Sequence, residues 1–438
     1  MNKEIPLMPL RDAGVKLIDC VHKTPAAAGQ GFPYIAIPQL TEGRIDVDSA
    51  RRISEQDMLK WNVKCNPQED DVILSRRCNP GVTAVVPKHF RGSLGQNLVL
   101  LRATDPNLMA PKYLRWATRG REWWNEVGRF INVGAVFESL KCVDIPDFAI
   151  PVPPVADQKA IAHILGTLDD KIALNRKTNE TLEAMAKALF KSWFVDFDPV
   201  RAKAEGRHTG LPAEISELFP DSFEDSELGE IPSGWECCSF TQLVEVISGG
   251  TPKTSIDEYW NGSVNWFSVV DAPSNSDCWV IHTEKSITHQ GLDNCSSKLL
   301  PIGTTIISAR GTVGKVCLTG QDMAMNQSCY GLRSKAANGE FFCFYLTKSL
   351  VEILEARAHG SVFSTITRDT LDGVSTNSPP LEVIQSFNSI TGALLGKIKN
   401  NLEESRILGN QRDALLPKLI SGEIRIPDAE KMLEEVGF

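Results

Sequence analysis

The stretch ISARGTVGKV, from Ile307 to Val316, indicates the fold of this chain because a similar stretch occurs earlier in the sequence. On its own it resembles a phosphate-binding loop, with an apolar lead-in followed by glycines and a lysine. Such a loop requires a glycine five positions before its Gly-Lys pair and a Ser or Thr after it. Ala309 stands five positions before Gly314, and Val316 follows Lys315. The sequence therefore predicts no nucleotide site at this stretch.

The earlier stretch is DVILSRRCNPGVTAVV, from Asp71 to Val86, where an apolar run again leads to Ser, Arg and a glycine-containing turn. Four further pairs of segments match in the same order, at offsets of 226 to 231 residues. They are HKTP ending at Pro25 with SGGTP ending at Pro252, GQNLVLLR ending at Arg102 with NQSCYGLR ending at Arg333, GAVFESL from Gly134 with GSVFSTI from Gly360, and VPP ending at Pro154 with SPP ending at Pro380. The common order predicts an internal duplication.

Each copy is followed by a long stretch with helical periodicity. In the first, apolar residues and two asparagines recur at alternating steps of four and three: Ile161, Leu165, Leu168, Ile172, Asn175, Asn179, Leu182, Ala186, Leu189 and Trp193. The matching positions of the second stretch are Phe387, Thr391, Leu394, Ile398, Asn401, Ser405, Leu408, Arg412, Leu415 and Leu419. This spacing predicts a coiled coil whose register is fixed by Asn175 and Asn401. Two amphipathic helices on separate cores are the alternative.

We therefore expect an α/β (α+β) fold with an internal pseudo-two-fold repeat. Two tandem mixed α/β domains would be separated by two long helices that form an antiparallel coiled coil. The expected segments are a first domain at 1–152, a central helix at 153–197, an acidic linker at 198–230, a second domain at 231–379, a C-terminal helix at 380–424 and a charged tail at 425–438.

Composition limits the class of protein. The chain has 438 residues, a net charge of −9 and eleven cysteines without the spacing of metal ligands. The acidic excess lies in the 198–230 segment, whereas a group of arginines lies in the first third, at Arg76, Arg77, Arg115, Arg119 and Arg121. A local basic surface is therefore compatible with the negative total. We find no signal peptide and no membrane-spanning run, and we expect a cytoplasmic protein with reduced thiols and no metal site.

Three segments carry a resemblance to a known family. They are PVPPVADQKAIAHILGTLDDKIALNRKTNETLEAMAKALFKSWFVDFDPVRAKAEG, GLPAEISELFPDSF with ELGEIPSGW, and RDALLPKLISGEIRIP. They resemble the specificity subunit of type I restriction–modification systems. The resemblance implies two target-recognition domains, each reading one half of a bipartite double-stranded DNA site. It also implies two methyltransferase subunits docked on the helices, and restriction subunits that translocate DNA. This chain would then bind no cofactor, while its partners use S-adenosylmethionine, ATP and Mg²⁺.

No catalytic residue is expected, because neither the adenine-methyltransferase motif nor a phosphate-binding loop is present. Arginine in a glycine-containing turn can bind a phosphate or a guanine edge. The candidate DNA-binding residues are accordingly Lys23, Thr24, Arg76, Arg77, Lys253, Thr254, Arg310 and Lys315. The matched Gln96 and Gln327 could read adenine or could satisfy groups of the core. The turns themselves could equally be structural.

The candidate partner-binding residues are Phe190, Trp193 and Phe194, large apolar side chains that a pair of helices cannot fully cover. Three alternatives remain open: a stand-alone DNA-binding regulator built by duplication, an enzyme with an unrecognised site, and a coiled-coil adaptor that does not bind DNA.

Overall fold

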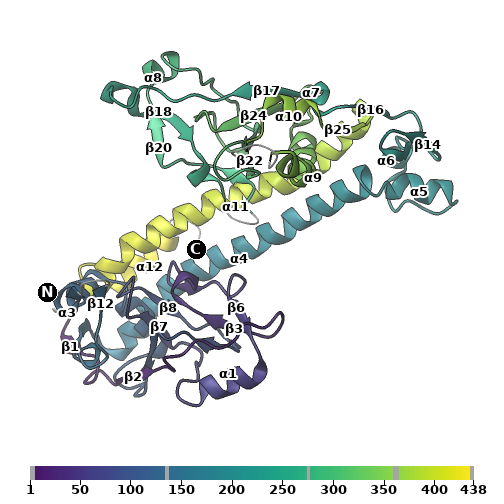
Figure 1. Ribbon diagram of the computed structural model, residues 1–438. Helices are drawn as coiled ribbons and strands as arrows, with labels where there is room; N and C mark the ends of the chain where they lie inside the picture. Colours follow the sequence, from purple (N-terminus) through teal and green to yellow (C-terminus); the bar gives the residue numbers. More distant parts are fainter. Residues whose placement is uncertain (1–4, 134–137, 274–276, 359–364, 435–438) are drawn as a thin grey trace. The chain divides into compact units, whose positions relative to one another are not determined.

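A computed structural model describes residues 5–133, 138–273, 277–358 and 365–434. The chain divides into two compact units, residues 1–171 with 407–438 and residues 172–406. The long helices α4 (Val155–Phe194) and α11 (Leu381–Ser421) each contribute one part to either unit (Figure 1).

The first unit is built on an antiparallel sheet of four strands in the order β2-β10-β7-β8. A second sheet, in the order β6-β3-β9, contains the parallel pair β3–β9, and β1 pairs with β13. The bounds are β1 (Leu7–Pro9), β2 (Val15–Asp19), β3 (Phe32–Ile35), β6 (Arg51–Ile53), β7 (Val72–Ser75), β8 (Thr83–Val85), β9 (Ser93–Leu94), β10 (Leu98–Ala103) and β13 (Ala149–Pro151), with helices α1 (Glu55–Asn62), α2 (Pro111–Ala117) and α3 (Arg121–Phe130).

The second unit repeats this topology. Its main sheet has the order β17-β24-β21-β22-β19, its second sheet β20-β18-β23 again has one parallel pair, and β16 pairs with β25. The bounds are β16 (Glu236–Ser239), β17 (Val244–Ser248), β18 (Trp260–Phe267), β19 (Trp279–Val280), β20 (Lys285–Ile287), β21 (Thr305–Ser308), β22 (Val316–Thr319), β23 (Met323–Met325), β24 (Cys329–Ser334) and β25 (Ser375–Ser378), with α8 (His289–Asp293), α9 (Glu340–Ala358) and α10 (Arg368–Asp372). The predicted duplication and the mixed α/β class are confirmed.

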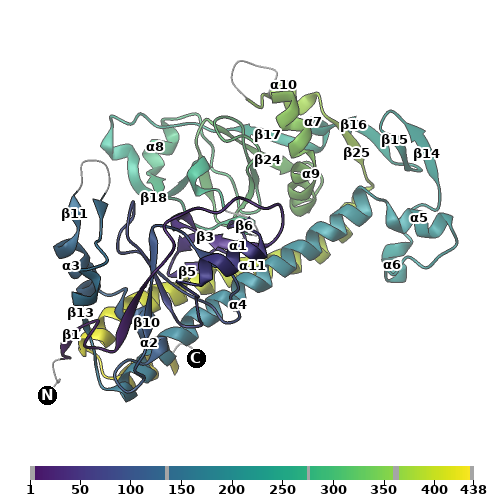
Figure 2. The ribbon, with the colours of Figure 1, turned by 60° about the horizontal axis from the view of Figure 1, so that its bottom comes forward.

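The central strands form where the sequence is most apolar. The strands β7 and β21 read VILS and TIIS, and every residue in them is buried. β-Branched and large aliphatic side chains favour such strands, which are covered on both faces. In the second unit α9 packs against β21, β22 and β24 (Figures 1 and 2). The quoted repeats therefore mark the middle of each main sheet.

The two long helices run antiparallel. Within the second unit, Asn175 Nδ2 donates to Ser405 Oγ at 3.2 Å, and Asn401 Nδ2 donates to Asn179 Oδ1 at 2.9 Å. Residues later in α4 thus contact residues earlier in α11. Asn175 and Asn401 are both buried, so the hydrogen bonds across the interface satisfy amides that would otherwise be costly to bury. The predicted antiparallel coil is confirmed, and the effect of these amides on register stays a prediction.

Phe190, Trp193 and Phe194 do not form a docking surface, and this prediction is wrong. Their exposed fractions are 4%, 1% and 7%. They lie in the core of the second unit, where Phe194 meets Phe342 and Phe387 with ring centroids 5.0 and 5.2 Å apart. The periodicity placed them on the helix, but it could not show that the unit's own aromatic side chains cover them.

The segment after α4 is folded, although its composition suggested only an acidic linker. It contains α5 (Asp198–Ala204), α6 (Ala213–Ser216) and the hairpin β14 (Phe223–Ser226) to β15 (Gly229–Pro232). Phe197, Val200 and Phe219 are buried in the core of the second unit. The acidic side chains therefore lie on a short packed subdomain.

The C-terminal segment is also helical, as α12 (Ile426–Glu434), and it buries Ala429 and Leu433. One matched pair of the repeat, GAVFESL and GSVFSTI, lies largely outside the described residues, at 134–137 and 359–364.

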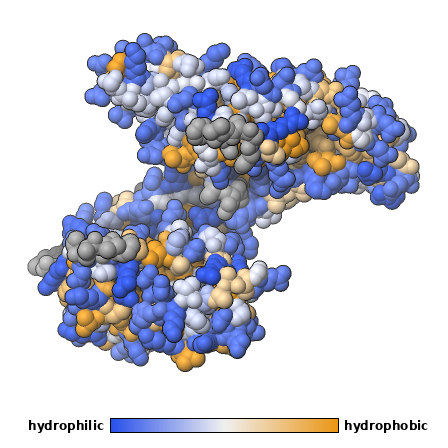
Figure 3. Space-filling view, in the orientation of Figure 1, coloured by the Kyte–Doolittle hydropathy of each residue, from blue (hydrophilic) through white to orange (hydrophobic). Residues whose placement is uncertain are grey.

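No helix among the described residues is long and apolar enough to cross a membrane. No cluster of three or more His, Cys, Asp or Glu side chains in the described ranges could hold a metal ion. The eleven cysteines are all free thiols. The visible surface is mostly hydrophilic, with apolar side chains in separate patches (Figure 3).

Candidate nucleic-acid interface

In each unit three loops meet at one edge of the main sheet. β2 and β7 end where β10 begins, as shown by the pairing of Val99 with Asp19 and of Leu98 with Ser75. In the second unit Tyr330 pairs with Ser248, and Cys329 with Ser308. We call this the loop edge. It is formed by residues 20–25, 76–82 and 95–97 in the first unit, and by residues 249–254, 309–315 and 326–328 in the second.

The turn at the end of β7 is closed by its serine. The Ser75 amide donates to the carbonyl of Val82 at 2.9 Å, and its own carbonyl accepts from Gly81 at 3.0 Å. Its hydroxyl donates to the carbonyl of Arg77 at 3.1 Å. The serine is fully buried and holds the turn that presents Arg77.

The turn at the end of β21 has the same two main-chain hydrogen bonds, and its serine hydroxyl also donates to a carbonyl of the turn. The Ser308 amide donates to the carbonyl of Lys315 at 2.9 Å, and Gly314 donates to the carbonyl of Ser308 at 3.0 Å. The hydroxyl of Ser308 donates to Thr312 O at 2.5 Å. The matched serines therefore have a structural role. The side chains that could contact DNA are the exposed ones of the two turns.

Gly81 and Gly314 are required by the backbone conformation of the turns. Their φ angles are +94° and +85°, which L side chains rarely adopt. A Cβ on Gly81 would lie 2.8 Å from a methyl group of Val127 on α3, and one on Gly314 would lie 2.2 Å from the carboxylate of Glu355 on α9. By contrast, Gly311 has open space beside it. Of these three glycines only Gly311 is exposed.

The structure brings the candidate cations of each unit to its loop edge. In the first unit Arg76 N donates to Asn97 O at 2.9 Å, which joins the turn after β7 to the turn before β10. In the second, Arg310 N donates to Ser328 O at 3.2 Å. Arg76 is half-buried, and its guanidinium donates to Leu140 O. The other candidates are exposed, namely Lys23, Thr24, Arg77, Lys253, Thr254, Arg310 and Lys315.

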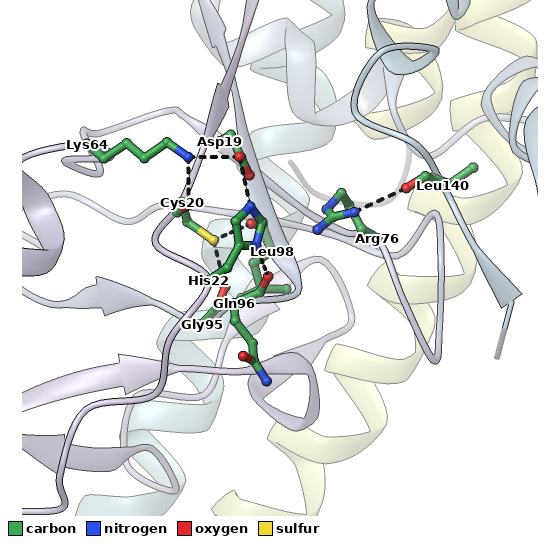
Figure 4. A network of polar contacts seen from close by, with 9 residues as sticks. All are labelled: Asp19, Cys20, His22, Lys64, Arg76, Gly95, Gln96, Leu98 and Leu140. Atoms are coloured by element: carbon green, nitrogen blue, oxygen red, sulfur yellow. Dashed lines mark hydrogen bonds and ion pairs between the residues drawn. The ribbon is translucent and has the colours of Figure 1, made fainter. Parts of the chain in front are cut away.

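A polar network joins the loop after β2 to the turn before β10 (Figure 4). His22 Nδ1 lies 3.0 Å from the carbonyl of Gln96, and its Nε2 lies 2.9 Å from Asp19 Oδ2. Lys64 Nζ, from the segment after α1, also binds Asp19 Oδ2 at 2.9 Å. Burial acts to raise the pKa of Asp19, but hydrogen bonds from Lys64 and His22 outweigh it, so this pKa lies below its usual value. Asp19 is therefore a carboxylate at neutral pH.

The buried side chain of Cys20 also joins the loop after β2 to the turn before β10. Its sulfur lies 3.0 Å from the carbonyl oxygen of Gly95 and 2.8 Å from that of Leu98, and the two oxygens share its single proton. Burial raises the pKa of Cys20 to about 11, so the thiol keeps its proton and remains a donor.

In the second unit a neutral contact closes the corresponding junction. The hydroxyl of Thr251 donates to the side-chain oxygen of Gln327. Arg368 at the start of α10 adds a cation, since its Nη2 donates to Val246 O at 2.8 Å and to Ser248 Oγ at 3.1 Å.

Sequence reasoning missed His22, Lys64 and Arg368. Lys64 and Arg368 reach the loop edge from distant segments that contain no recognisable motif. His22 is next to the candidate Lys23, but isolated histidines have many structural roles.

The first unit also carries a hollow of about 370 Å³ beside its loop edge. Thr24, Tyr34, Gln39, Arg51 and Gln96 are among its lining residues. Arg51 is exposed, so it adds a cation that the sequence did not single out.

Comparisons with known proteins agree with this duplicated arrangement. The family model described as "Type I restriction modification DNA specificity domain" matches residues 21–184 and 232–404. The specificity subunit of the HindI type I restriction enzyme of Haemophilus influenzae is 28% identical over 66% of this chain and 72% of its own length. The MjaIX specificity subunit of Methanocaldococcus jannaschii is 25% identical, covering 86% of this chain and 83% of its own.

A crystal structure of the type I restriction–modification S subunit from M. genitalium shares the fold, with a TM-score of 0.59 over 96% of this chain and 97% of that one at 14% identity. The two family matches span both loop edges and most of α4 and α11. The chain therefore belongs to the family of type I restriction–modification DNA specificity proteins.

Proposed function

We propose that this chain recognises a bipartite double-stranded DNA site, one half-site with each unit, and so directs methylation and restriction by partner subunits. The loop edges carry the proposal. Both units present exposed cations on the same buried scaffold, at Arg77 in one and at Arg310 and Lys315 in the other. Cations on a rigid edge suit phosphate contacts that position a protein on DNA.

The two edges differ in the side chains that could read bases. The turn after β7 reads RRCNPG, and the turn after β21 reads ARGTVG. Base readout depends on side-chain donors and acceptors in the groove, so different edges suit different half-sites. A stand-alone regulator built by duplication is less favoured, since the relatives are specificity subunits of restriction enzymes.

We assign the chemistry to the partners. Two methyltransferase subunits would supply S-adenosylmethionine-dependent methylation of adenine, and restriction subunits would supply ATP- and Mg²⁺-dependent translocation and cleavage. This chain would position them on DNA without a cofactor of its own. The apolar side chains that α4 leaves exposed, such as Leu174 and Met185, are better docking candidates than the buried aromatic residues.

The test is a genome-wide map of methylated adenines in cells with and without this chain, with its methyltransferase present in both. We expect a bipartite motif with a fixed gap that disappears when the chain is removed. Methylation that persists unchanged, or a continuous motif without a gap, would contradict the proposal.

A further inference from the structure

The matched residues Gln96 and Gln327 are held in different ways at the two loop edges. Gln96 accepts from His22 through its main-chain carbonyl, and no hydrogen bond to its carboxamide occurs within the described part of the chain. Figure 4 shows that this side chain is directed away from the His22 network. The carboxamide of Gln327, in contrast, is bound by the hydroxyl of Thr251.

The surroundings of Gln96 suit an external partner. The side chain is exposed, and Gln96 is one of the residues that line the hollow of the first unit. Two further carboxamides line it, those of Gln39 and Asn97, and both residues are half-buried. Gln39 is also engaged, because its Oε1 accepts from the Ala36 amide at 3.2 Å and its Nε2 donates to Ser49. Of the three carboxamides only that of Gln96 belongs to an exposed residue.

A free carboxamide has a specific match on double-stranded DNA. In the major groove its oxygen can accept from adenine N6 while its nitrogen donates to adenine N7. No other base presents this pair of groups there. The candidates Lys23 and Thr24, next to His22, could contact the neighbouring phosphates.

Resting on the proposed function, we propose that Gln96 reads one adenine in the half-site of the first unit, and that His22 is the positioning residue that holds it there.

His22 joins the turn that carries Gln96 to the end of β2. Both ring nitrogens face acceptors, the carbonyl of Gln96 and the carboxylate of Asp19. A side chain without this ring would lose both contacts and loosen the turn that carries Gln96.

The first experiment measures methylation by the whole complex on a DNA library that varies each position of the mapped site. Gln96→Ala should lower discrimination roughly 5- to 150-fold at a single A·T pair of one half-site. Gln327→Ala is the matched control in the other unit and should leave that position unchanged. Replacing the adenine with 7-deazaadenine should weaken binding of the unmodified complex and have little effect on the Gln96→Ala complex. An unchanged motif in Gln96→Ala, or relaxation at a G·C pair, would overturn the inference.

The second experiment measures discrimination at that A·T pair in two variants of His22. His22→Ala removes both contacts of the ring and should lower discrimination at this pair while leaving the other half-site unchanged. His22→Gln keeps an amide donor and should restore part of the loss. His208→Ala is the control, because His208 is exposed and lies in the segment after α4, outside the loop edges. Discrimination in His22→Ala equal to that of the unmodified complex would remove His22 from the mechanism.

The map of the unmodified complex separates the two proposals. If that complex methylates no bipartite site, the proposed function fails. If the site is found but Gln96→Ala reads it unchanged, only the role of Gln96 fails.

Discussion

Replacing Asp169 by Asn should strongly destabilise the first unit. Asp169 lies on α4 with a side chain 1% exposed, between three guanidinium groups. Arg412 on α11 donates to its Oδ1 at 2.6 Å, Arg115 on α2 binds its Oδ2, and Arg44 lies 3.7 Å from the same oxygen. One carboxylate thus joins α2, α4, α11 and the strand β5 (Arg44–Ile45) within this unit.

The magnitude follows from what the substitution leaves behind. The side chains of Arg44, Arg115 and Arg412 are 27%, 16% and 13% exposed, so water can solvate them only in part. Removing one partner from a buried ion pair costs about 3–5 kcal/mol, because the remaining charge is left uncompensated. We expect about 3 kcal/mol here, since some solvation remains. For a unit of about 200 residues this corresponds to a decrease in Tm of roughly 6–12 °C.

The pH dependence gives a second readout. Burial acts to raise the pKa of Asp169, but the charge of Arg115 and the hydrogen bond from Arg412 outweigh it and lower the pKa. A carboxyl whose pKa is lower in the folded state stabilises the protein above its unfolded pKa, and this stabilisation is lost as the pH falls through the folded pKa. The difference between Asp169→Asn and the unmodified chain should therefore be largest near neutral pH and shrink in acid.

The assay is thermal unfolding of the full chain with its methyltransferase, followed by circular dichroism and calorimetry from about pH 4 to about pH 7.5. Asp170→Asn is the matched control, because it removes the same charge from an exposed neighbour on α4. A Tm for Asp169→Asn within the range of this control at neutral pH would refute the reasoning.

Three further predictions test the interface, the core and the helices. Arg310→Ala should lower the slope of log DNA affinity against log salt concentration by about one if Arg310 binds a phosphate. Arg333→Ala is the control, because Arg333 lies at the opposite end of β24, and it should not change the slope. Equal slopes for both variants would show that the turn after β21 has only a structural role. Trp193→Ala should cost about 3–5 kcal/mol of stability, measured by chemical unfolding, because the side chain is 1% exposed; a loss below about 1 kcal/mol would contradict its place in the core. One heptad inserted after both Ile172 and Ile398 keeps the apolar seam in phase and adds about 10 Å to each helix. On a library of DNA sites with different gap lengths, the preferred gap should become longer by about three base pairs while the half-sites stay the same. An unchanged gap would show that the helices do not set the gap length.

The sequence by itself determined the architecture. The repeat of Ser-Arg turns placed β7 and β21 correctly, because a buried central strand requires a continuous apolar run. Each turn also ends in a glycine with a positive φ, at Gly81 and Gly314. The alternating steps of three and four placed α4, α11 and the paired Asn175 and Asn401, because helical periodicity is a local property. The candidate cations also reached one edge in each unit, since antiparallel neighbours bring strand ends together.

Only the tertiary structure decided which side chains are covered and which are paired. Periodicity indicated that Trp193 lies on an apolar face, but the aromatic side chains that bury it come from distant elements. In the sequence Arg412 was a polar residue at the seam without a known partner. The structure shows that it binds the carboxylate of Asp169, a residue that is not part of the apolar pattern. The matched glutamines looked equivalent in sequence, yet His22 binds one through its main chain and Thr251 binds the other through its side chain. Pairing of this kind depends on side chains that are far apart in sequence, so a local sequence pattern cannot predict it.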